Sequence, residues 1–364
     1  MEVNTKFINE INRLIKFTLK QKETFLEQNN KKEANVQTFK IRNYYKALDS
    51  IKTLKDEITD IKQVEALSGV GEGMKSRISE ILSQGYITEI KDFDNKTPDQ
   101  KTIELDKLQT ITGIGPKKAM QIYDDKITFD TLLQLFQDLT SKHNTEDIKE
   151  LMVHAENDDS YLKNLTHHQL VGIKYYHSIN ERIPRDEIRK IELKLKNVIH
   201  KLDPKLIFTI CGSYRRQLST SGDIDVLITH PDIKEEDDVG DELINIIAAL
   251  TKAKLLVDDL TTLGKTKYMG ICKLNKNSKG RRIDIRFIAQ NDYFPALVYF
   301  TGSKDLNTTM RAEALKLGYT INEYGIYKMT KKDGKIVKGD KIVVNSEEDL
   351  FKMVNMEYLE PAKR

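Results

Sequence analysis

Three aspartates in two short apolar segments are the residues of this chain best suited to chemistry. In residues 222–228, GDIDVLI, strand alternation puts Ile224, Val226 and Ile228 on one face and Asp223 and Asp225 on the other. Residues 281–289, RRIDIRFIA, place Asp284 on a polar face in the same way. If the strands are neighbours, the carboxylates repel one another unless divalent cations lie between them. Two-metal phosphoryl transfer has this requirement, so we predict that the three aspartates are catalytic and bind two Mg²⁺ ions, for which Mn²⁺ can substitute.

A second motif, GSYRR at residues 212–216, precedes the acidic pair and follows an apolar segment. Gly212 lets the backbone come close to a ligand, Ser213 donates a hydrogen bond, and Arg215 and Arg216 neutralise negative charge. We expect these groups to meet at one spot and to bind a triphosphate. An isolated Asp-x-Asp strand is more often a solvated edge, but the preceding GS and the aspartate on a second strand favour catalysis.

Two segments of the N-terminal half share an apolar-x-Gly-apolar-Gly pattern that opens a helix, one with Gly69 and Gly71 and the other with Gly113 and Gly115. Paired glycines permit a tight turn, and free amides at a helix start favour an anion. This is the helix-hairpin-helix arrangement, which binds a DNA phosphate without reading bases. A single copy would be explained as well by an ordinary turn; two copies, each followed by a basic helix, favour DNA binding.

Composition limits the classes of protein that remain. The 364 residues are 39% hydrophobic and 32% charged, which is typical of two to four folded domains. The net charge of +3 hides a basic stretch at residues 40–55 and an acidic one at 232–242. Cys211 and Cys272 lie in apolar runs and indicate neither disulfides nor a zinc site. No secretory signal and no apolar stretch of roughly 20 residues is present, so we expect a soluble intracellular protein without a membrane partner.

Hydrophobic spacing predicts an α+β fold. Helical periodicity runs from residue 4 to about residue 90, and a polar linker with Pro98 follows at residues 92–102. From residue 205 onward, apolar strand segments alternate with helices or loops. We therefore expect an all-helical N-terminal domain with the two hairpins, then a nucleotidyltransferase palm, then a small α+β thumb-like subdomain.

These motifs resemble the family X DNA polymerases, the family of DNA polymerase beta. The likeness extends to HHQLVGIKYY at 167–176, to IPRDEI from 183, to YFTGSKDLNTTMRAEALKLGYTINEYGIY at 299–327 and to SEEDLF and EYLEP near the end, and so covers nearly the whole chain. It implies a lyase-type domain (1–92), a fingers-like subdomain (93–181), a catalytic palm (182–290) and a nucleotide-selecting C-terminal subdomain (291–364).

The resemblance also implies a function. Family members of this type fill short gaps in base excision repair by template-directed synthesis. The expected partners are gapped or nicked DNA and deoxynucleoside triphosphates, with repair ligases or endonucleases as further candidates. We expect a monomer that works in the nucleus or at a site of viral DNA replication and repair.

The resemblance carries over to individual residues. Asp223, Asp225 and Asp284 match the metal triad, with the first two bridging both ions and the third binding the ion at the primer 3′-hydroxyl. Matches to nucleotide contacts are Arg182, Ser213, Arg216, Gly222, Tyr299, Phe300, Gly302 and Asn307. The backbone at Tyr299 would collide with a 2′-hydroxyl. Asn307 matches a minor-groove contact to the incoming base, and Arg311 one to the template.

Further matches concern DNA. Lys40, Tyr44 and Lys46 match a pocket that holds a 5′-phosphate; a solvated basic helix face is the alternative. In the family, backbone carbonyls of each hairpin bind a monovalent cation, Na⁺ or K⁺. The matching residues here are Leu67 and Val70 in the first hairpin and Ile111 and Ile114 in the second, where carbonyls facing water remain the alternative.

The chain departs from the family at several positions. Arg77 stands where repair members have a Schiff-base lysine, and Gly73 replaces a phosphate-binding lysine; arginine cannot act as the amine, so we expect weak or absent lyase activity. Lys75, about 200° around the helix, is the remaining candidate nucleophile. Lys304 and Thr308 replace an acid and a lysine near the base pair. Residues 138–161 resemble an acidic insertion.

Two alternative functions, and the partner of the Arg286 side chain, are not decided by the sequence. A template-independent transferase would carry a longer loop than the short turn KLNKNSKGRR before the second acidic strand. A catalytically idle DNA-end scaffold would gain only repulsion from the three acids. Arg286, on the same strand face as Asp284, is expected either to pair with a catalytic carboxylate or to form a structural ion pair.

Overall fold

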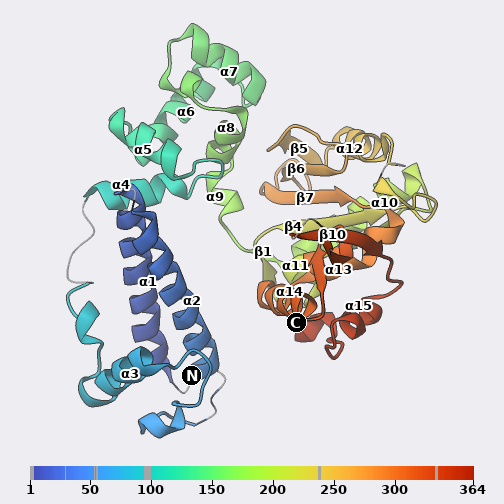
Figure 1. Cartoon of the computed structure of the whole chain (residues 1–364). Helices are drawn as coiled ribbons and strands as arrows, with labels where there is room; N and C mark the ends of the chain where they lie inside the picture. The colour runs from blue at the N-terminus through green and yellow to red at the C-terminus, as the bar shows by residue number, and fades with distance from the viewer. Residues whose placement is uncertain are drawn as a thin grey trace. The chain divides into compact units, whose positions relative to one another are not determined.

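The computed structural model of the protein describes residues 4–28, 30–52, 54, 56–93, 100–236, 239–332 and 335–364 (Figure 1). Two compact units are present, Met1–Ile103 and Glu104–Arg364. The expected linker, residues 92–102, adjoins their boundary, but residues 100–102 are already helical, and residues 94–99, with Pro98, are outside the described residues. In the described part of the chain, none of the helices has both the length and the apolar character needed to traverse a bilayer.

In the described residues of the N-terminal unit, all regular secondary structure is helical, as predicted. Its elements are α1 (Thr5–Glu27), α2 (Lys31–Lys52), the 3₁₀ helix η1 (Ile61–Gln63), α3 (Glu72–Gln84) and η2 (Thr88–Ile90). Helices α1 and α2 pack along each other as a long pair (Figure 1). Ile11, Leu14 and Ile15 on α1 are almost completely buried, which explains their helical spacing.

The second unit begins with a helical part that covers one edge of a sheet. Helix α4 (Gln100–Gln109) begins in the last residues of the first unit and ends in the second. The helices that follow are α5 (Pro116–Asp124), α6 (Phe129–His143), α7 (Ile148–Asn157), η3 (Tyr161–Asn164), α8 (His167–Lys174) and α9 (Tyr176–Ile179). Asp258 on the edge strand accepts hydrogen bonds from Lys174 Nζ at 2.8 Å and from the Tyr175 hydroxyl at 2.6 Å. Leu260 and Ile271 extend the apolar contact between the two parts.

A five-stranded sheet forms the centre of the second unit. Its strands, in spatial order, are β2 (Ile207–Ile210), β4 (Ile224–Thr229), β7 (Arg281–Phe287), β6 (Lys267–Cys272) and β5 (Leu256–Asp259). Only β4 and β7 run parallel; the other neighbours are antiparallel. Helices α10 (Arg185–Leu202) and α12 (Glu242–Lys252) share one core with the apolar side chains on one face of these strands. The other face carries the acidic residues, and Leu227 and Ile271 on that face belong to separate apolar clusters. Two short strands, β1 (Ile183–Pro184) and β3 (Thr220–Ser221), pair separately, and α11 (Gly212–Arg215) follows β2.

The C-terminal part is a small α+β unit with its own apolar core. It contains η5 (Gln290–Asp292), α13 (Tyr293–Thr301), α14 (Lys304–Lys316), β8 (Tyr319–Asn322), β9 (Gly325–Lys332), β10 (Lys335–Ile342), α15 (Glu347–Met353) and η6 (Pro361–Lys363). The three strands form an antiparallel sheet in the order β10, β9, β8. The α+β fold expected from the sequence is confirmed.

A buried ionic network joins this C-terminal part to the central sheet region. Glu347 accepts two hydrogen bonds from Arg215 at 2.9 and 2.8 Å and one from Arg364 at 2.8 Å. The side chains of Glu347 and Arg364 are 6% and 0% exposed. One carboxylate thus compensates two guanidinium groups, and its loss would leave both in a poorly hydrated place.

We expect the substitution E347A to lower the free energy of unfolding by about 3 kcal/mol, because it leaves the buried Arg364 and the partly buried Arg215 without their carboxylate. The matched control is E313A, since Glu313 pairs with Lys316 at the surface of α14 and should contribute less than about 0.5 kcal/mol. Urea unfolding of both variants measures the difference. Equal losses in the two variants would contradict this account of the network.

Candidate active site

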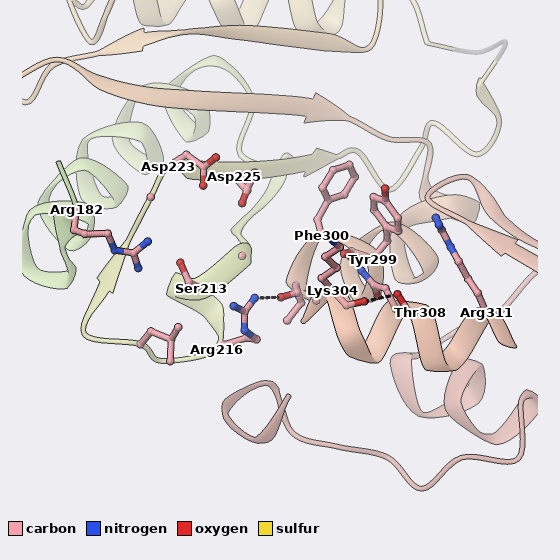
Figure 2. A pocket seen from close by; sticks show the side chains of 16 residues that line it. Arg182, Ser213, Arg216, Asp223, Asp225, Tyr299, Phe300, Lys304, Thr308 and Arg311 are labelled. Carbon is pink, nitrogen blue, oxygen red and sulfur yellow. Dashed lines mark hydrogen bonds between the residues drawn. The ribbon is translucent and has the colours of Figure 1, made fainter. Parts of the chain in front are cut away.

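A cavity of about 760 Å³ opens beside the acidic start of β4 (Figure 2). Residues from α11, the turn before β4, the end of α13 and the start of α14 line it. Of the side chains and glycines predicted for the site, the cavity brings together Arg182, Ser213, Arg216, Gly222, Asp223, Asp225, Tyr299, Phe300, Gly302, Asn307 and Arg311. Two segments separated by more than seventy positions therefore form one concave surface.

Asp225 and Asp284 lie opposite each other on neighbouring parallel strands. The register of β4 and β7 pairs their Cα positions, as it pairs Ile224 with Ile283. Both isoleucines are fully buried, so strand alternation turns the two carboxylates to the other face. Asp223 precedes β4, and its charge acts on both of the other acids. The structure thus brings the three predicted carboxylates together, with Asp284 next to the cavity lining.

This crowding changes the acid strength of two carboxyls. Burial, followed by the charges of Asp223 and Asp284, raises the pKa of Asp225 to about 7. Burial is also the main reason that the pKa of Asp284 is raised. Oδ1 of Asp284 is buried and has no hydrogen-bond partner. Crowded carboxylates with an uncompensated oxygen fit a hard divalent cation such as Mg²⁺, because binding would remove both the repulsion and the missing contact.

Gly212 is required by the close approach of α11 to the acidic pair. Its φ is +56°, and a Cβ atom there would lie 2.5 Å from Oδ2 of Asp225. Any other residue would therefore collide with a carboxylate and also adopt a strained backbone. The short helix α11 consequently holds Ser213 and Arg216 beside the aspartates, with Arg182 nearby (Figure 2).

The two arginines of GSYRR have different positions, so the expectation that both would serve one spot is wrong. Arg216 lines the cavity and donates through Nη1 to the carbonyl of Thr301 at 2.7 Å. Arg215 points to the C-terminal part, where it binds Glu347 and the Thr301 hydroxyl. Of these two arginines, only Arg216 remains a candidate for binding a triphosphate. The acidic partner of Arg215 lies 132 positions away in the sequence, and no pattern near Arg215 predicts this contact.

Strand β7 gives a second correction. Arg282, rather than Arg286, forms the ion pair with one of the three predicted carboxylates, from Nη2 to Oδ2 of Asp223. The guanidinium of Arg286 lies over the ring of Phe300, 5.3 Å from its centroid. Arg282 was missed in the sequence, although its spacing of two residues from Asp284 already placed it on the same strand face.

The opposite wall of the cavity comes from the junction of α13 and α14. Asn307 donates through Nδ2 to the carbonyl of Tyr299 at 2.7 Å, and Arg311 lies over the Tyr299 ring at 5.2 Å. Gly302 ends α13 with a φ of +71°. Lys304 and Thr308, the two departures from the family pattern, also line this wall (Figure 2). This wall thus has a basic side chain at position 304, where the family pattern has an acid, and a hydroxyl at position 308 in place of the family's lysine.

The two hairpins have the same local structure. Leu67 and Ile111 accept hydrogen bonds through their carbonyls from the amides of Val70 and Ile114, at 3.1 and 3.0 Å. Gly69 and Gly113 have φ values of +85° and +90°, as the turn requires. Gly71 and Gly115 are the N-caps of α3 and α5, and a Cβ atom at either would have open space around it. Each hairpin therefore presents an accessible helix start, as its glycines predict.

The first hairpin is pressed against α2. A Cβ atom at Gly69 would lie 2.4 Å from the Ala47 amide nitrogen and 2.8 Å from Cβ of Lys46. Lys40 and Lys46 are exposed on α2, whereas Tyr44 is buried. The predicted 5′-phosphate residues are therefore two free basic side chains and one ring that is mostly covered.

Arg77 on α3 is held by three neighbours. Its Nη1 donates to the Gly73 carbonyl at 2.8 Å, its Nε donates to Glu89 at 3.0 Å, and its guanidinium lies 5.6 Å from the centroid of the Tyr44 ring. The position that matches the family lysine is thus occupied by a cation already neutralised by Glu89.

The raised pKa of Asp225 predicts a pH dependence. A carboxyl with a raised pKa destabilises the metal-free fold as the pH climbs from about 4 through about 7, because the folded state loses its proton less readily than the unfolded chain. We expect D225N to exceed the parent protein in free energy of unfolding by about 2 kcal/mol at about pH 8, with a smaller gain at about pH 5.5. Urea unfolding with a chelator measures both values.

The control for this test is D232N. Asp232 is an exposed carboxyl whose pKa is lowered by its hydrogen bond to Lys205, so its replacement should give no gain at the higher pH. A gain for D225N that grows toward acid pH would contradict the assignment of the shift to Asp225.

Comparison with known families matches three segments of the chain. Residues 182–290 match the model described as DNA polymerase beta palm, and residues 296–364 match the DNA polymerase beta thumb. Residues 11–87 match a helix-hairpin-helix domain. The palm match contains all three aspartates, and the thumb match contains the opposite wall of the cavity.

Curated relatives extend over most of the chain. DNA polymerase lambda of Rattus norvegicus is 30% identical over 343 residues, which cover 92% of this chain and 54% of that protein. DNA polymerase lambda of Arabidopsis thaliana is 28% identical over 334 residues, covering 88% and 57%. DNA nucleotidylexotransferase of Xenopus laevis is 26% identical over 356 residues, covering 88% and 63%. The chain therefore spans between about half and two thirds of the length of these relatives.

The order of a helix-hairpin-helix domain, a palm and a thumb on one chain agrees with the cavity and its carboxylates. Together with the polymerase lambda relatives, this order shows that the chain belongs to family X of the DNA polymerases.

Proposed function

We propose that this protein is a template-directed DNA polymerase that fills short gaps in DNA repair by two-metal nucleotidyl transfer. The observation that carries the proposal is the direct pairing of Asp225 and Asp284 across parallel strands, beside a cavity with Arg182, Ser213 and Arg216. Acidic and basic side chains on one surface suit a nucleoside triphosphate and the cations that accompany it.

Each group of the site has a task in this proposal. Asp223 and Asp225 would hold both Mg²⁺ ions, or Mn²⁺ in their place, and Asp284 the ion at the primer end. The bound ions would lower the pKa of the 3′-hydroxyl and stabilise charge on the attacking and leaving oxygens. Ser213, Arg182 and Arg216 would bind and orient the triphosphate, with Gly222 allowing its approach.

The opposite wall would select the nucleotide. In this proposal, the backbone at Tyr299, with Phe300 and Gly302, excludes a 2′-hydroxyl. Asn307 would contact the minor-groove edge of the incoming base and Arg311 that of the template. These edges present acceptors in every correct pair, so the contacts test shape rather than sequence.

Substrate and partners follow from the same reasoning. The hairpins with Gly69, Gly71, Gly113 and Gly115 would hold DNA phosphates, with Na⁺ or K⁺ at the carbonyls of Leu67, Val70, Ile111 and Ile114. Lys40, Tyr44 and Lys46 would dock a 5′-phosphate at a gapped or nicked site. We propose a monomer that acts on DNA in the nucleus or at a site of viral replication, alongside a repair ligase or endonuclease. The predicted subdomain boundaries near residues 92, 181 and 290 belong to this proposal.

We expect D284A to reduce gap filling by at least about a hundredfold, because it removes a ligand that supplies several kcal/mol of charge stabilisation. Binding to gapped DNA should stay within about twofold, since neither hairpin nor the basic face of α2 is touched. The control is D232A, an exposed Asp→Ala change. Single-nucleotide incorporation and a gel-shift titration measure the two quantities. Unchanged incorporation in D284A would refute the catalytic assignment.

A template-independent transferase is the second candidate function, favoured by the similarity to the Xenopus nucleotidylexotransferase. Against it stands the connection between β6 and β7, which runs only from residue 273 to residue 280 and closes with a hydrogen bond from the Ser278 amide to the Asn275 carbonyl at 3.1 Å. Extension of a gapped duplex compared with a lone single strand separates the two functions. A non-catalytic scaffold would extend neither.

Lyase activity should be weak or absent. We expect negligible borohydride trapping on an incised abasic site, because Arg77 carries no nucleophilic amine. R77K alone should stay poorly reactive, since Glu89 would keep the new amine protonated, whereas R77K/E89Q should be trapped at least about tenfold more than the parent. E89Q, which keeps Arg77, is the matched control. Trapping in this variant would have to come from another amine, such as that of Lys75. Strong trapping of the parent protein, abolished by K75A, would contradict the proposal.

A further inference from the structure

In the described structure, the acidic site already contains a cation of its own. The guanidinium of Arg282 forms an ion pair with Asp223, and the two side chains are 37% and 26% exposed. The arginine is therefore already paired with one of the three carboxylates.

The arginine reaches this place because of strand alternation. Along β7, Ile283, Ile285 and Phe287 are fully buried, while Arg282, Asp284 and Arg286 are partly exposed on the other face. Arg282 thus lies on the face that carries the acids. Asp223 precedes the neighbouring strand β4, so the guanidinium bridges two strands.

The pairing leaves the acidic site incomplete as a metal site. Nε of Arg282 and Oδ1 of Asp284 are both buried without hydrogen-bond partners. Among the described residues, no three acidic, histidine or cysteine side chains are arranged around one point as a bound ion requires. With Asp223 turned to Arg282, one carboxylate is engaged and another has an oxygen without compensation.

We propose that Arg282 is the resting counter-ion of Asp223 in the acidic site and that a divalent ion binds by exchange, taking the Asp223 carboxylate from the guanidinium. This inference rests on the proposed function, because it takes the aspartates to be the metal site. It implies that the apparent affinity for the ion is reduced by the work of displacing Arg282, as for any ligand that must displace a competitor.

Arg286 offers a matched comparison. It has the same charge, the same strand and the same face, two residues further along β7. Its guanidinium lies over the Phe300 ring, and its charge acts on Asp284 only at a distance. Removing Arg286 changes the general electrostatic field of the site, whereas removing Arg282 also frees the Asp223 carboxylate.

The test is Mn²⁺ binding to the full chain without nucleotide or DNA, measured as free Mn²⁺ by electron paramagnetic resonance. We expect R282Q to bind Mn²⁺ at least about fivefold more tightly than the parent protein, and R286Q less than about twofold more tightly. R282K keeps a charge but loses the planar fork, so its affinity should lie between those of the parent and R282Q. Thermal unfolding of each variant with and without Mn²⁺ provides a second readout, and R282K carries the test if R282Q does not fold.

Equal tightening in R282Q and R286Q would overturn the exchange, because the general field would then be sufficient. Weaker binding in R282Q would overturn it as well, since Arg282 would then support the ion. The substitution D284N separates this inference from the proposed function. If D284N leaves Mn²⁺ binding unchanged, the aspartates are not the metal site; if it weakens binding while the two arginine variants behave alike, only the exchange fails.

Discussion

The arrangement of this protein depends on one electrostatic constraint, the crowding of three carboxylates at the point where two parallel strands meet. Parallel pairing of β4 and β7 places Asp225 directly beside Asp284, and the buried isoleucines behind them prevent either strand from turning. Such a cluster is unfavourable on its own. The raised pKa of Asp225, the pairing of Asp223 with Arg282 and the glycine at 212 are all responses to it.

The rest of the second unit holds the walls of the cavity in register with this cluster. Glu347 connects the C-terminal part to Arg215 on α11, the helix whose next residue is Arg216. Arg216 in turn donates to the Thr301 carbonyl at the end of α13. A short helix one turn long therefore joins the side of the cavity that contains Arg216 to the opposite wall at the end of α13. If either wall moved, these contacts would move or break, and the position of the other wall would change with them.

Much of this could be predicted from the sequence, because the informative patterns were local. Strand alternation placed Asp223, Asp225 and Asp284 correctly, and the paired glycines identified both hairpins. The predictions that were wrong concern arginines. Whether Arg215 or Arg216 faces the cavity depends on Glu347, far along the chain, and whether Arg282 or Arg286 pairs with an acid depends on the position of Phe300. The partner of a long side chain depends on which groups lie near it in the folded protein. Strand alternation and sequence spacing do not predict those neighbours.

The contact between Gly69 and α2 has a consequence for the N-terminal unit. Because the turn leaves no space for even a methyl group against Ala47, the accessible start of α3 and the α2 backbone that carries Lys40 and Lys46 belong to a single rigid body. A nucleic acid strand held at both places would therefore meet one fixed point, the start of α3, and two adjustable ones, because the lysine amines end long flexible side chains. The backbone contact sets the distance between the two helices, and the lysines can adapt to strands of different shape.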